Sequence, residues 1–390
     1  MKTRLSYLVF AIASLFCLAS CGPKKRQILP VPFPVNTSVD MNGVAAKPAV
    51  ADVALNDAAR FVAGLPIKNK GSKLYALTQT EGWKTHARNM DQIWNSFQQT
   101  TPKLIAFAKS ELADVNSGYH TLFYPFGGPD YLFPNTFFPY MDTYFLIGLE
   151  RAGSVIEIEK PSAETYQLYQ NAVSDILNLS FFRTDGVKEE IFNDTIDGVV
   201  PIISLLMVRS GREIVSIRNM RITNEGDIVA INKDGSAITR GTGLVEFQYF
   251  RSGAKKLQTL YYLTADLSNG DFTGNKPLLA YIGKLNISTT ATFIKSASYL
   301  MHVSGFSAVR QVILSHTSAV VQDDSGIPLP FYKTTDWDVT LYGTFLKPTP
   351  QFAKYIQPEL RDAYQQEDPK PLSFRIGYAK QSNLQIARKK

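Results

Sequence analysis

The adjacent carboxylates Asp323 and Asp324 are the residues of this sequence best suited to acid–base chemistry. Two carboxyls held close together can adopt different protonation states, so that one serves as an acid and the other as a base. If Asp130, in another Gly/Pro-rich loop, approaches them to about 5–10 Å, the group would suit glycoside hydrolysis. In turns, however, Asp side chains often accept hydrogen bonds from backbone amides. The sequence therefore leaves a catalytic and a turn-stabilising role open for these residues.

Aromatic side chains are concentrated around Asp130. Ten of them lie from Phe123 to Phe145, in a segment that four prolines and the pair Gly127-Gly128 exclude from a regular helix or a central strand. If exposed, they would form a platform for sugar rings, peptides or a partner protein, and if buried they would form a core. The candidate ligand- or partner-binding residues are therefore Tyr124, Asp130, Tyr131, Asp323, Asp324 and Trp337.

Metal and cofactor motifs are not recognisable in the sequence. The four histidines never occur at the close spacing of a helical metal pair, so zinc is not expected. Residues 114–118 have the oxygen ligands that open a calcium loop, but Pro125 occupies the position where a bidentate Glu would close it. The group around Asp194 and Asp197 could bind a cation weakly or cap a helix. Nucleophile-elbow and nucleotide-binding glycine motifs are missing too, so we expect no metal, no cofactor and no catalytic residue.

The N-terminus has the layout of a bacterial lipoprotein signal peptide, predicted over 1–20. Lys2 and Arg4 precede an apolar run, 5–19, that is shorter than the roughly 20 residues of a membrane-spanning helix and ends in small residues before Cys21. The resemblance to lipoprotein signals implies cleavage before Cys21 and lipidation of that residue, which would anchor the chain in a bilayer. Because Gly22 follows in place of an Asp, the outer membrane is favoured over the inner membrane of the cell envelope.

Composition excludes some classes of partner and cross-link. Both cysteines lie at or before position 21, so the mature body cannot contain a disulfide and must rely on its core. Without Lys2 and Arg4 the chain keeps 39 basic and 34 acidic residues, a formal charge of +5. This excess is spread along the chain, so nucleic acid is not an expected partner. The proline-containing segment 21–51 is predicted to be an extended tether.

Helical spacing and aromatic strands alternate in 52–211, which we predict to be the first half of the body. Apolar residues at helical spacing run from Leu55 to Val62 and again from Trp83 to Phe97, and Thr101-Pro102 is a typical helix start. Further helices are predicted over 161–178 and 199–208, and strands over 119–126 and 143–149.

Short alternating runs separated by turn residues follow in 212–272, where we predict antiparallel hairpins such as the one around Ser252-Gly253. The second half of the body, 273–390, again mixes the two periods. We predict helices through Ile294, Ala297 and Met301, from Ser307, and from Thr349-Pro350, and strands over 318–322, 337–345 and 372–378.

The predicted fold class is α+β, with two packed helix-strand-strand-helix halves and antiparallel hairpins between them. The halves share an order of parts, including a strand glycine at Gly148 and Gly343 and a Gly/Pro loop before each strand. An internal duplication and the chance recurrence of a common unit both explain this order.

Two phrases, 124–132 around Gly127-Gly128-Pro129-Asp130 and 322–329 around Asp323-Asp324, resemble those of a group of uncharacterised exported bacterial proteins. The resemblance extends over most of the mature chain, including Gly148-Leu149-Glu150 and Ser382-Asn383-Leu384. It implies export and brings no activity with it.

We therefore expect a non-catalytic envelope lipoprotein that binds a partner or ligand through its aromatic Gly/Pro loops. Its expected partners are the bilayer, through acylated Cys21, and an envelope protein or glycan. The alternative is a periplasmic or surface hydrolase that acts on envelope glycan with Asp130, Asp323 or Asp324.

Overall fold

The computed structural model of the chain describes residues 49–179, 196–231, 241–251, 253–254, 256–378 and 382–390. These residues all belong to one compact unit, Phe33–Lys390. The predicted leader, Cys21 and Asp194 lie outside the described residues. Within the described ranges, every helix is too short or too polar to cross a bilayer.

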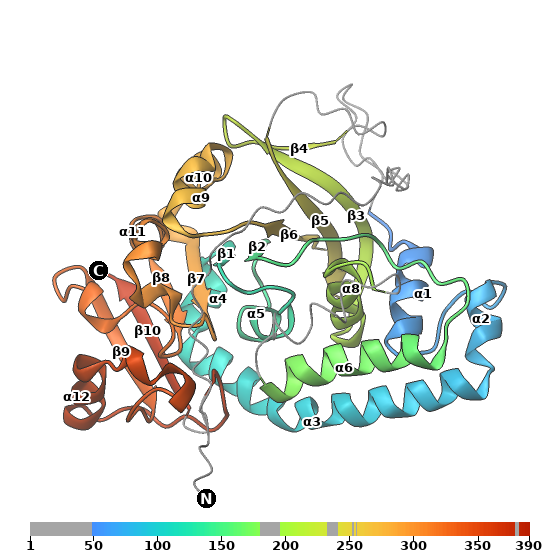
Figure 1. Cartoon of the computed structure of the whole chain (residues 1–390), viewed down its shortest axis with the longest axis horizontal. Helices are drawn as coiled ribbons and strands as arrows, with labels where there is room; N and C mark the ends of the chain where they lie inside the picture. The colour runs from blue at the N-terminus through green and yellow to red at the C-terminus, as the bar shows by residue number, and fades with distance from the viewer. Residues whose placement is uncertain (1–48, 180–195, 232–240, 252, 255, 379–381) are drawn as a thin grey trace, which may run out of the picture. The chain divides into compact units, whose positions relative to one another are not determined.

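Five parallel strands form the centre of a ten-stranded mixed sheet (Figure 1). In sheet order they are β6 (Gln258–Thr264), β2 (Thr143–Gly148), β1 (Thr121–Tyr124), β7 (Thr290–Ile294) and β8 (Ala319–Gln322). Beside β6 lie β5 (Gly241–Arg251), β3 (Arg212–Thr223) and β4 (Ile228–Ala230), and beside β8 lie β10 (Asn383–Lys389) and β9 (Trp337–Gly343). These outer strands pair antiparallel, and the predicted mixed α+β class is confirmed.

Side chains alternate along the central strands, so the sheet separates two hydrophobic clusters. In β1, Leu122 and Tyr124 pack into one cluster and Phe123 packs into the other. The face of Tyr124 is covered by α1 (Val53–Val62), α3 (Glu81–Glu111), α5 (Leu132–Phe137), α6 (Ala163–Leu179) and α8 (Val200–Arg209). The face of Phe123 is covered by α9 (Asn269–Gly274), α10 (Lys276–Gly283) and α11 (Ser307–His316). The other α-helices are α2 (Lys73–Thr78), α4 (Ala113–Gly118) and α12 (Pro358–Gln366).

The neighbouring strands β1 and β7 send the chain in opposite directions. From β1 the chain passes through α5 to β2, and from β7 it passes through α11 to β8 on the other side. Numbered in chain order, the parallel strands are arranged 3-2-1-4-5, as in doubly wound nucleotide-binding sheets. Such a reversal opens a crevice outside the carboxyl ends of the two strands, where ligands bind in open α/β sheets. The fold therefore points to the loops after β1 and β7.

The internal duplication, one of the two explanations that the sequence left open, is not confirmed, because the two halves use their strands differently. β1 and β2 are parallel neighbours, whereas β10 separates β8 from β9 and pairs antiparallel with both. The predicted hairpins are present in strands β3 to β6. In the sheet these four strands lie together on one side of β2. One continuous sheet thus joins the three predicted segments of the body.

The prediction of a new helix at Thr101-Pro102 is wrong, since α3 continues through Pro102. A proline inside a helix lacks the N–H that would bond the carbonyl four residues earlier, here that of Gln98. Both Gln98 and Pro102 are exposed, so water can replace the missing bond. The proline therefore interrupts one hydrogen bond without ending the helix. Along its length α3 packs beside α6 (Figure 1).

Two other predictions from spacing are also wrong. Ile294, Ala297 and Met301 were expected on one helix face, but they belong to the end of β7, a loop and a short 3-10 helix, Leu300–His302. Residues 372–378 alternate like a strand, yet the final strand is β10. In both places an irregular backbone passes the core and buries side chains at the spacing of a regular element. The helices α9 and α10 were not predicted.

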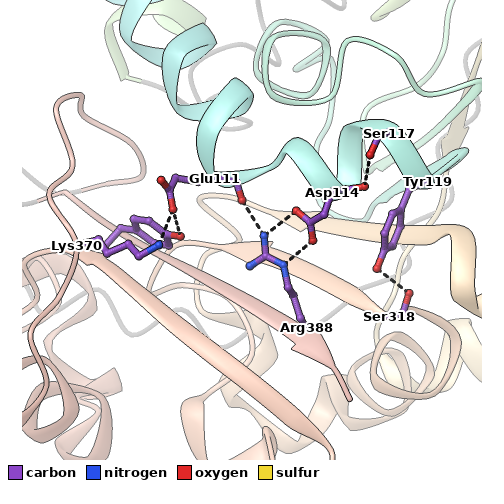
Figure 2. A network of polar contacts seen from close by, with 8 residues as sticks. Glu111, Asp114, Ser117, Tyr119, Ser318, Lys370 and Arg388 are labelled. Atoms are coloured by element: carbon purple, nitrogen blue, oxygen red, sulfur yellow. Dashed lines mark hydrogen bonds and ion pairs between the residues drawn. The ribbon is translucent and has the colours of Figure 1, made fainter.

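Polar contacts connect α3 and α4 with the two C-terminal strands (Figure 2). The Arg388 guanidinium makes a two-point contact with the Asp114 carboxylate, with N···O distances of 2.7 and 2.9 Å. Glu111 accepts hydrogen bonds from the Lys370 ammonium at 2.8 Å and from the Tyr342 hydroxyl at 2.6 Å. These bonds lower the pKa values of Asp114 and Glu111. The first and second halves of the body are thus tied together at their surface as well as through the sheet.

Candidate functional site

A cavity of about 450 Å³ opens at the carboxyl ends of the parallel strands. Its walls include residues of the loops that follow β1, β2, β6 and β7, namely 126–130, 149–150, 265–267 and 295–298. We call it the switch cavity, because it lies where the direction of the chain reverses between β1 and β7. Its volume falls in the range of about 300–1,000 Å³ that is usual for small-molecule sites.

A buried ion pair forms one wall of the switch cavity. The Lys295 ammonium lies 3.0 Å from the Asp130 carboxylate, and the side chains are only 1% and 3% exposed. Asp130 also accepts a hydrogen bond from the Tyr124 hydroxyl at 2.9 Å and one from the Phe133 amide at 3.2 Å. Burial, followed by the charge of Asp130, raises the pKa of Tyr124 far above its ordinary value, so its phenol stays a hydrogen-bond donor. The pair joins the loop after β1 to the loop after β7.

Glu150 follows the end of β2, and its carboxylate faces Gly128 in the turn after β1 and Gly148 at the end of β2. A Cβ on Gly128, whose φ is +51°, would lie 3.3 Å from the Glu150 carboxylate, and a Cβ on Gly148 would lie 2.6 Å from it. The backbone carbonyl of Glu150 accepts hydrogen bonds from the hydroxyls of Tyr262 and Thr264, both at 2.8 Å. The two glycines thus make room for a carboxylate that β6 holds at the cavity wall.

Backbone strain is concentrated around the same cavity. Among the described residues, the non-glycine residues with positive φ are Phe126, Ser296, Ser298 and Tyr299, with values of 64°, 52°, 49° and 56°. Three of them line the cavity and Tyr299 follows directly after Ser298. A left-handed conformation costs a non-glycine residue about 1–2 kcal/mol and persists only where the surroundings impose it. Strain of this kind gathers at binding and active sites, which supports a functional role for the two loops.

The predicted pair Asp323 and Asp324 supplies part of this support. Asp323 accepts hydrogen bonds from the Ser296 amide at 2.8 Å and from the Ser325 amide at 3.0 Å. Asp324 accepts one from the Asn383 side chain at 2.9 Å and another from the Tyr299 hydroxyl. Both carboxylates therefore hold the strained loop after β7 from behind.

Burial governs the titration of this pair. The pKa of Asp323 is raised to about 6, first by burial and then by the neighbouring charge of Asp324. Burial also raises the pKa of Asp324, against the lowering effect of its bonds to Tyr299 and Asn383. The sequence left a catalytic and a turn-stabilising role open for this pair. The structure shows the stabilising role, because both carboxylates accept hydrogen bonds from backbone or side-chain donors.

The structure separates the predicted site residues into three groups. Tyr124 and Asp130 line the switch cavity, whereas Asp323 and Asp324 lie behind its wall. Tyr131 and Trp337 are core residues away from the cavity. Tyr131 packs edge-on against Tyr249 on the face covered by α3, and Trp337 packs against Tyr332 in the opposite cluster. Of the two roles that the sequence left open for the aromatic residues, these two have the buried one.

Glu150, Lys295 and Ser296 line the cavity but were not among the predicted site residues. For Glu150 a signal was present, because it follows Gly128 by 22 residues at the end of the next strand. This is the position of the acidic residue in doubly wound nucleotide-binding sheets. Lys295 gave no comparable signal, since its partner Asp130 is distant in the sequence and the segment was predicted as a helix.

Among the described residues, the carboxylates of the switch cavity do not belong to a group that could hold a metal ion. Within the part of the chain that the structure describes, there is no group of three or more His, Cys, Asp or Glu side chains that could hold a metal. Of the carboxylates in the cavity, that of Asp130 is already paired with Lys295.

No protein-family model matches the chain, and no curated protein matches it either.

Proposed function

We propose that the switch cavity binds a small, phosphate-free ligand with neighbouring hydroxyl groups, of the nucleoside type. The observation that carries the proposal is the Glu150 carboxylate, placed at the end of β2 against Gly128. In doubly wound sheets, an acidic residue about 20 positions beyond the first glycine-rich turn accepts hydrogen bonds from ribose hydroxyls. Glu150 has the same place in the topology and nearly the same spacing.

Charge disfavours a ligand that carries phosphates. Three carboxylates line the cavity, those of Asp130, Glu150 and Asp266, and among the described lining residues Lys295 is the only cation. Carboxylates therefore outnumber cations among the described lining residues, and such a lining disfavours an anionic ligand. The helix after β1, α5, has six residues and does not offer the long helix N-terminus that usually binds pyrophosphate. A neutral or positively charged nucleoside fits these features.

Aromatic side chains complete a site for a flat ring. Phe126, Phe306 and Phe352 line the cavity, and the rings of the first two are 5.9 Å apart. Aromatic rings stack on, or pack edge-on against, a planar ligand. In this proposal Phe126 contributes the aromatic Gly/Pro loop to the site, at the wall of the cavity.

The geometry supports binding better than the alternative of glycan hydrolysis. Asp323 and Asp324 are engaged with backbone and side-chain donors, and neither lines the cavity. Asp130 does line it, but its charge is compensated by Lys295. Two carboxyls on either side of a substrate, as glycoside hydrolysis requires, are not found among these residues.

Isothermal titration calorimetry with the mature chain tests this proposal. Adenosine and S-adenosylmethionine represent neutral and cationic nucleosides, NAD⁺ and ATP carry phosphates, and N-acetylglucosamine represents an envelope sugar. We expect binding of at least one of the first two and much weaker binding of NAD⁺ and ATP. Preference for the sugar would assign the hydroxyl-binding site to a glycan, and preference for ATP would contradict the proposal.

The substitution Glu150→Gln keeps the shape of the side chain and removes its charge. We expect it to weaken nucleoside binding by about ten-fold or more, because a hydrogen bond to a charged group contributes about 1.5–3 kcal/mol. Glu157→Gln, at an exposed position outside the lining, is the matched control and should bind like the unsubstituted chain. Equal binding by both variants would remove Glu150 from the site.

We also propose that this body is lipid-anchored in the cell envelope through Cys21. The substitution Cys21→Ser removes the thiol that would be acylated, so we expect the protein to leave the membrane fraction. Immunoblots of membrane and soluble fractions measure the change, with Cys17→Ser as the control that keeps the lipidation site. A Cys21→Ser variant that stays with the membrane would contradict the anchor.

A further inference from the structure

A second cleft, of about 640 Å³, lies at the amino ends of the parallel strands, opposite the switch cavity at their carboxyl ends. Its lining comes from α3, α4, α5 and the segment before β2, and from Arg212 and Arg251. Arg212 begins β3 and Arg251 ends β5, next to the start of β6, so both lie at the amino ends of the parallel strands. We call it the arginine cleft. The two cavities are therefore separated by the length of the central strands.

Positive charge dominates the arginine cleft. Lys109, Arg209, Arg212 and Arg251 line it, and none of the described lining residues carries a carboxylate. Arg212 and Arg251 are directly opposite each other in the β3–β5 pair, so their side chains leave the sheet on the same face. Like charges in directly opposed positions destabilise a sheet unless something lies between them. Their placement suits an anion that both guanidinium groups can contact.

Arg212 is the strongest evidence for a bound anion. Although it is only 6% exposed, its guanidinium donates to the neutral side chains of Tyr131, at 3.2 Å, and Asn135, at 3.0 Å. Among the described residues no carboxylate lies within ion-pair distance of it. Arg209, in contrast, is paired with Asp91 at 2.6 Å. A buried charge without a counter-ion is costly, and an anion in the cleft would offset that cost.

Next to these cations, the hydroxyl group of Ser210 has no hydrogen-bond partner in the structure. The hydroxyl oxygen of Ser210, between Arg209 and Arg212 in the sequence, is buried and makes no hydrogen bond. Buried polar groups are nearly always satisfied, so an unsatisfied one needs an explanation. A carboxylate oxygen near Arg212 would accept this hydrogen bond.

The rest of the lining is apolar. Trp94, Phe97, Ile105, Leu132 and Tyr140 belong to it, and Ile105 and Tyr140 are 40% and 57% exposed at the surface. An inorganic anion would leave this surface in contact with water, whereas an anion with a hydrocarbon chain would cover it. A polyanion such as nucleic acid would need a broad basic surface in place of these apolar walls.

We infer that the arginine cleft binds an acyl-chain carboxylate, with its anionic end at Arg212 and Arg251 and its chain along Trp94 and Ile105. This inference is independent of the proposed function of the switch cavity, since the two sites share no lining residue among those that the structure describes. It assigns an anionic ligand to the amino ends of the parallel strands, whereas a neutral or positively charged ligand is expected at their carboxyl ends.

The test uses dodecanoate below its micelle concentration, added to the full mature chain and followed by calorimetry and by tryptophan fluorescence. We expect saturable binding with a change in fluorescence, because Trp94 lines the cleft. Dodecyltrimethylammonium, with the same chain and a positive charge, should bind at least ten-fold more weakly. Acetate, which has the charge and no chain, should also bind at least ten-fold more weakly.

Two variants locate the binding site. Arg251→Gln, at an exposed position, should weaken dodecanoate binding by about ten-fold without affecting the fold. Arg212→Met should abolish it. Arg375→Gln, another exposed arginine outside the lining, is the matched control and should leave binding unchanged.

The inference would be overturned by absence of dodecanoate binding, by equal binding of the cationic detergent, or by dodecanoate binding that neither Arg251→Gln nor Arg212→Met weakens. Tighter binding of a short peptide with a leucine at its free C-terminus would also overturn it, because the cleft would then recognise a peptide carboxylate.

Discussion

The switch cavity and the arginine cleft lie at opposite ends of the same parallel strands and treat charge in opposite ways. In the switch cavity the buried cation, Lys295, has its counter-ion within the protein, at 3.0 Å. In the arginine cleft the buried cation, Arg212, donates only to neutral partners among the described residues. A charge that is compensated internally stabilises the fold of its own surroundings, whereas a charge that is left uncompensated is available to a ligand.

The loops explain this difference. At the carboxyl ends of the strands, the chain turns through strained residues that need strong internal support, and Asp130, Asp323 and Asp324 provide it. At the amino ends, α4 and the segment before β2 lead into the strands without such strain among the described residues. Asp130, Asp323 and Asp324 therefore maintain the shape of the first region, whereas Arg212 in the second is placed to contact a ligand.

The largest expected effect comes from breaking the internal pair. Lys295→Met leaves the Asp130 carboxylate buried without its cation, so we expect a loss of about 3–5 kcal/mol in the free energy of unfolding. Arg212→Met, measured without added ligand, should stay within about 1 kcal/mol of the unsubstituted chain, because no carboxylate loses a partner. Urea denaturation followed by circular dichroism measures both.

A double variant, Asp130→Asn with Lys295→Met, sharpens this test. If the large cost comes from the unpaired carboxylate, removing its charge as well should recover part of the lost stability. Equal losses for Lys295→Met and Arg212→Met would contradict the distinction between the two sites.

A smaller effect is expected at the glycine that faces Glu150. Gly128→Ala places a Cβ 3.3 Å from the Glu150 carboxylate at a φ of +51°, so it adds crowding to backbone strain. We expect a loss of about 2–3 kcal/mol in the free energy of unfolding, together with weaker nucleoside binding. Dodecanoate binding in the arginine cleft should not change.

Gly211→Ala is the matched control for Gly128→Ala. Its φ of +70° imposes the same kind of strain, but nothing lies within 4 Å of an added Cβ. We expect a loss of about 1 kcal/mol and unchanged nucleoside binding. If both substitutions had the same effect on stability and binding, close packing against Glu150 would have no role.

The third prediction concerns how the contribution of Asp323 and Asp324 to the free energy of unfolding depends on pH. Because burial raises the pKa of both Asp323 and Asp324, each contributes stability that is complete below about pH 4 and is lost as the pH rises through its folded pKa, which for Asp323 is about 6. Asp324→Asn removes one charge, and the Asn383 amide, whose Oδ1 has no partner, can turn to accept from the new amide. Relative to the unsubstituted chain, the variant should therefore gain about 1–2 kcal/mol between pH 4.5 and 7.5.

Denaturation curves at a series of pH values measure this difference, and the comparison cancels other titrations. His86 and His302, whose pKa values burial lowers to about 4, destabilise the folded state as the pH falls below about 6.5, in both proteins alike. A difference between the variant and the unsubstituted chain that stays constant with pH would show that the two carboxylates do not interact in this way.

Sequence reasoning predicted much of the local structure, because many helices and strands have their usual periods. Strands β2 and β8, the β5–β6 hairpin and the helices α1, α6, α8 and α11 lie close to their predicted positions. The errors occur where a loop crosses the core, as after β7, because side chains that reach the core from an irregular backbone imitate a helix or strand.

The site was predicted less completely than the elements. Tyr124 and Asp130 were found because unusual residues surround them in the sequence. Lys295 and Glu150 depend on the order of strands in the sheet, which brings together the ends of β1, β2 and β7. Since strand order is a property of long-range pairing, a single sequence with no recognised nucleotide-binding motif does not specify it.

The smallest expected effect is at the surface, where Arg388 and Asp114 connect the two halves of the body (Figure 2). Their side chains are 31% and 53% exposed, so water and salt screen the pair. We expect Asp114→Asn to cost less than about 1 kcal/mol at pH 7 and low ionic strength, and almost nothing in 0.5 M salt. The pKa of Asp114 is lowered mainly by its bond to Arg388, so this contribution is also lost as the pH falls through that lowered value. Lys295→Met, in contrast, should cost the same at both salt concentrations, because its pair is buried. A salt-independent loss for Asp114→Asn would mean that the surface pair behaves like the buried one, and exposure would then not explain the difference between them.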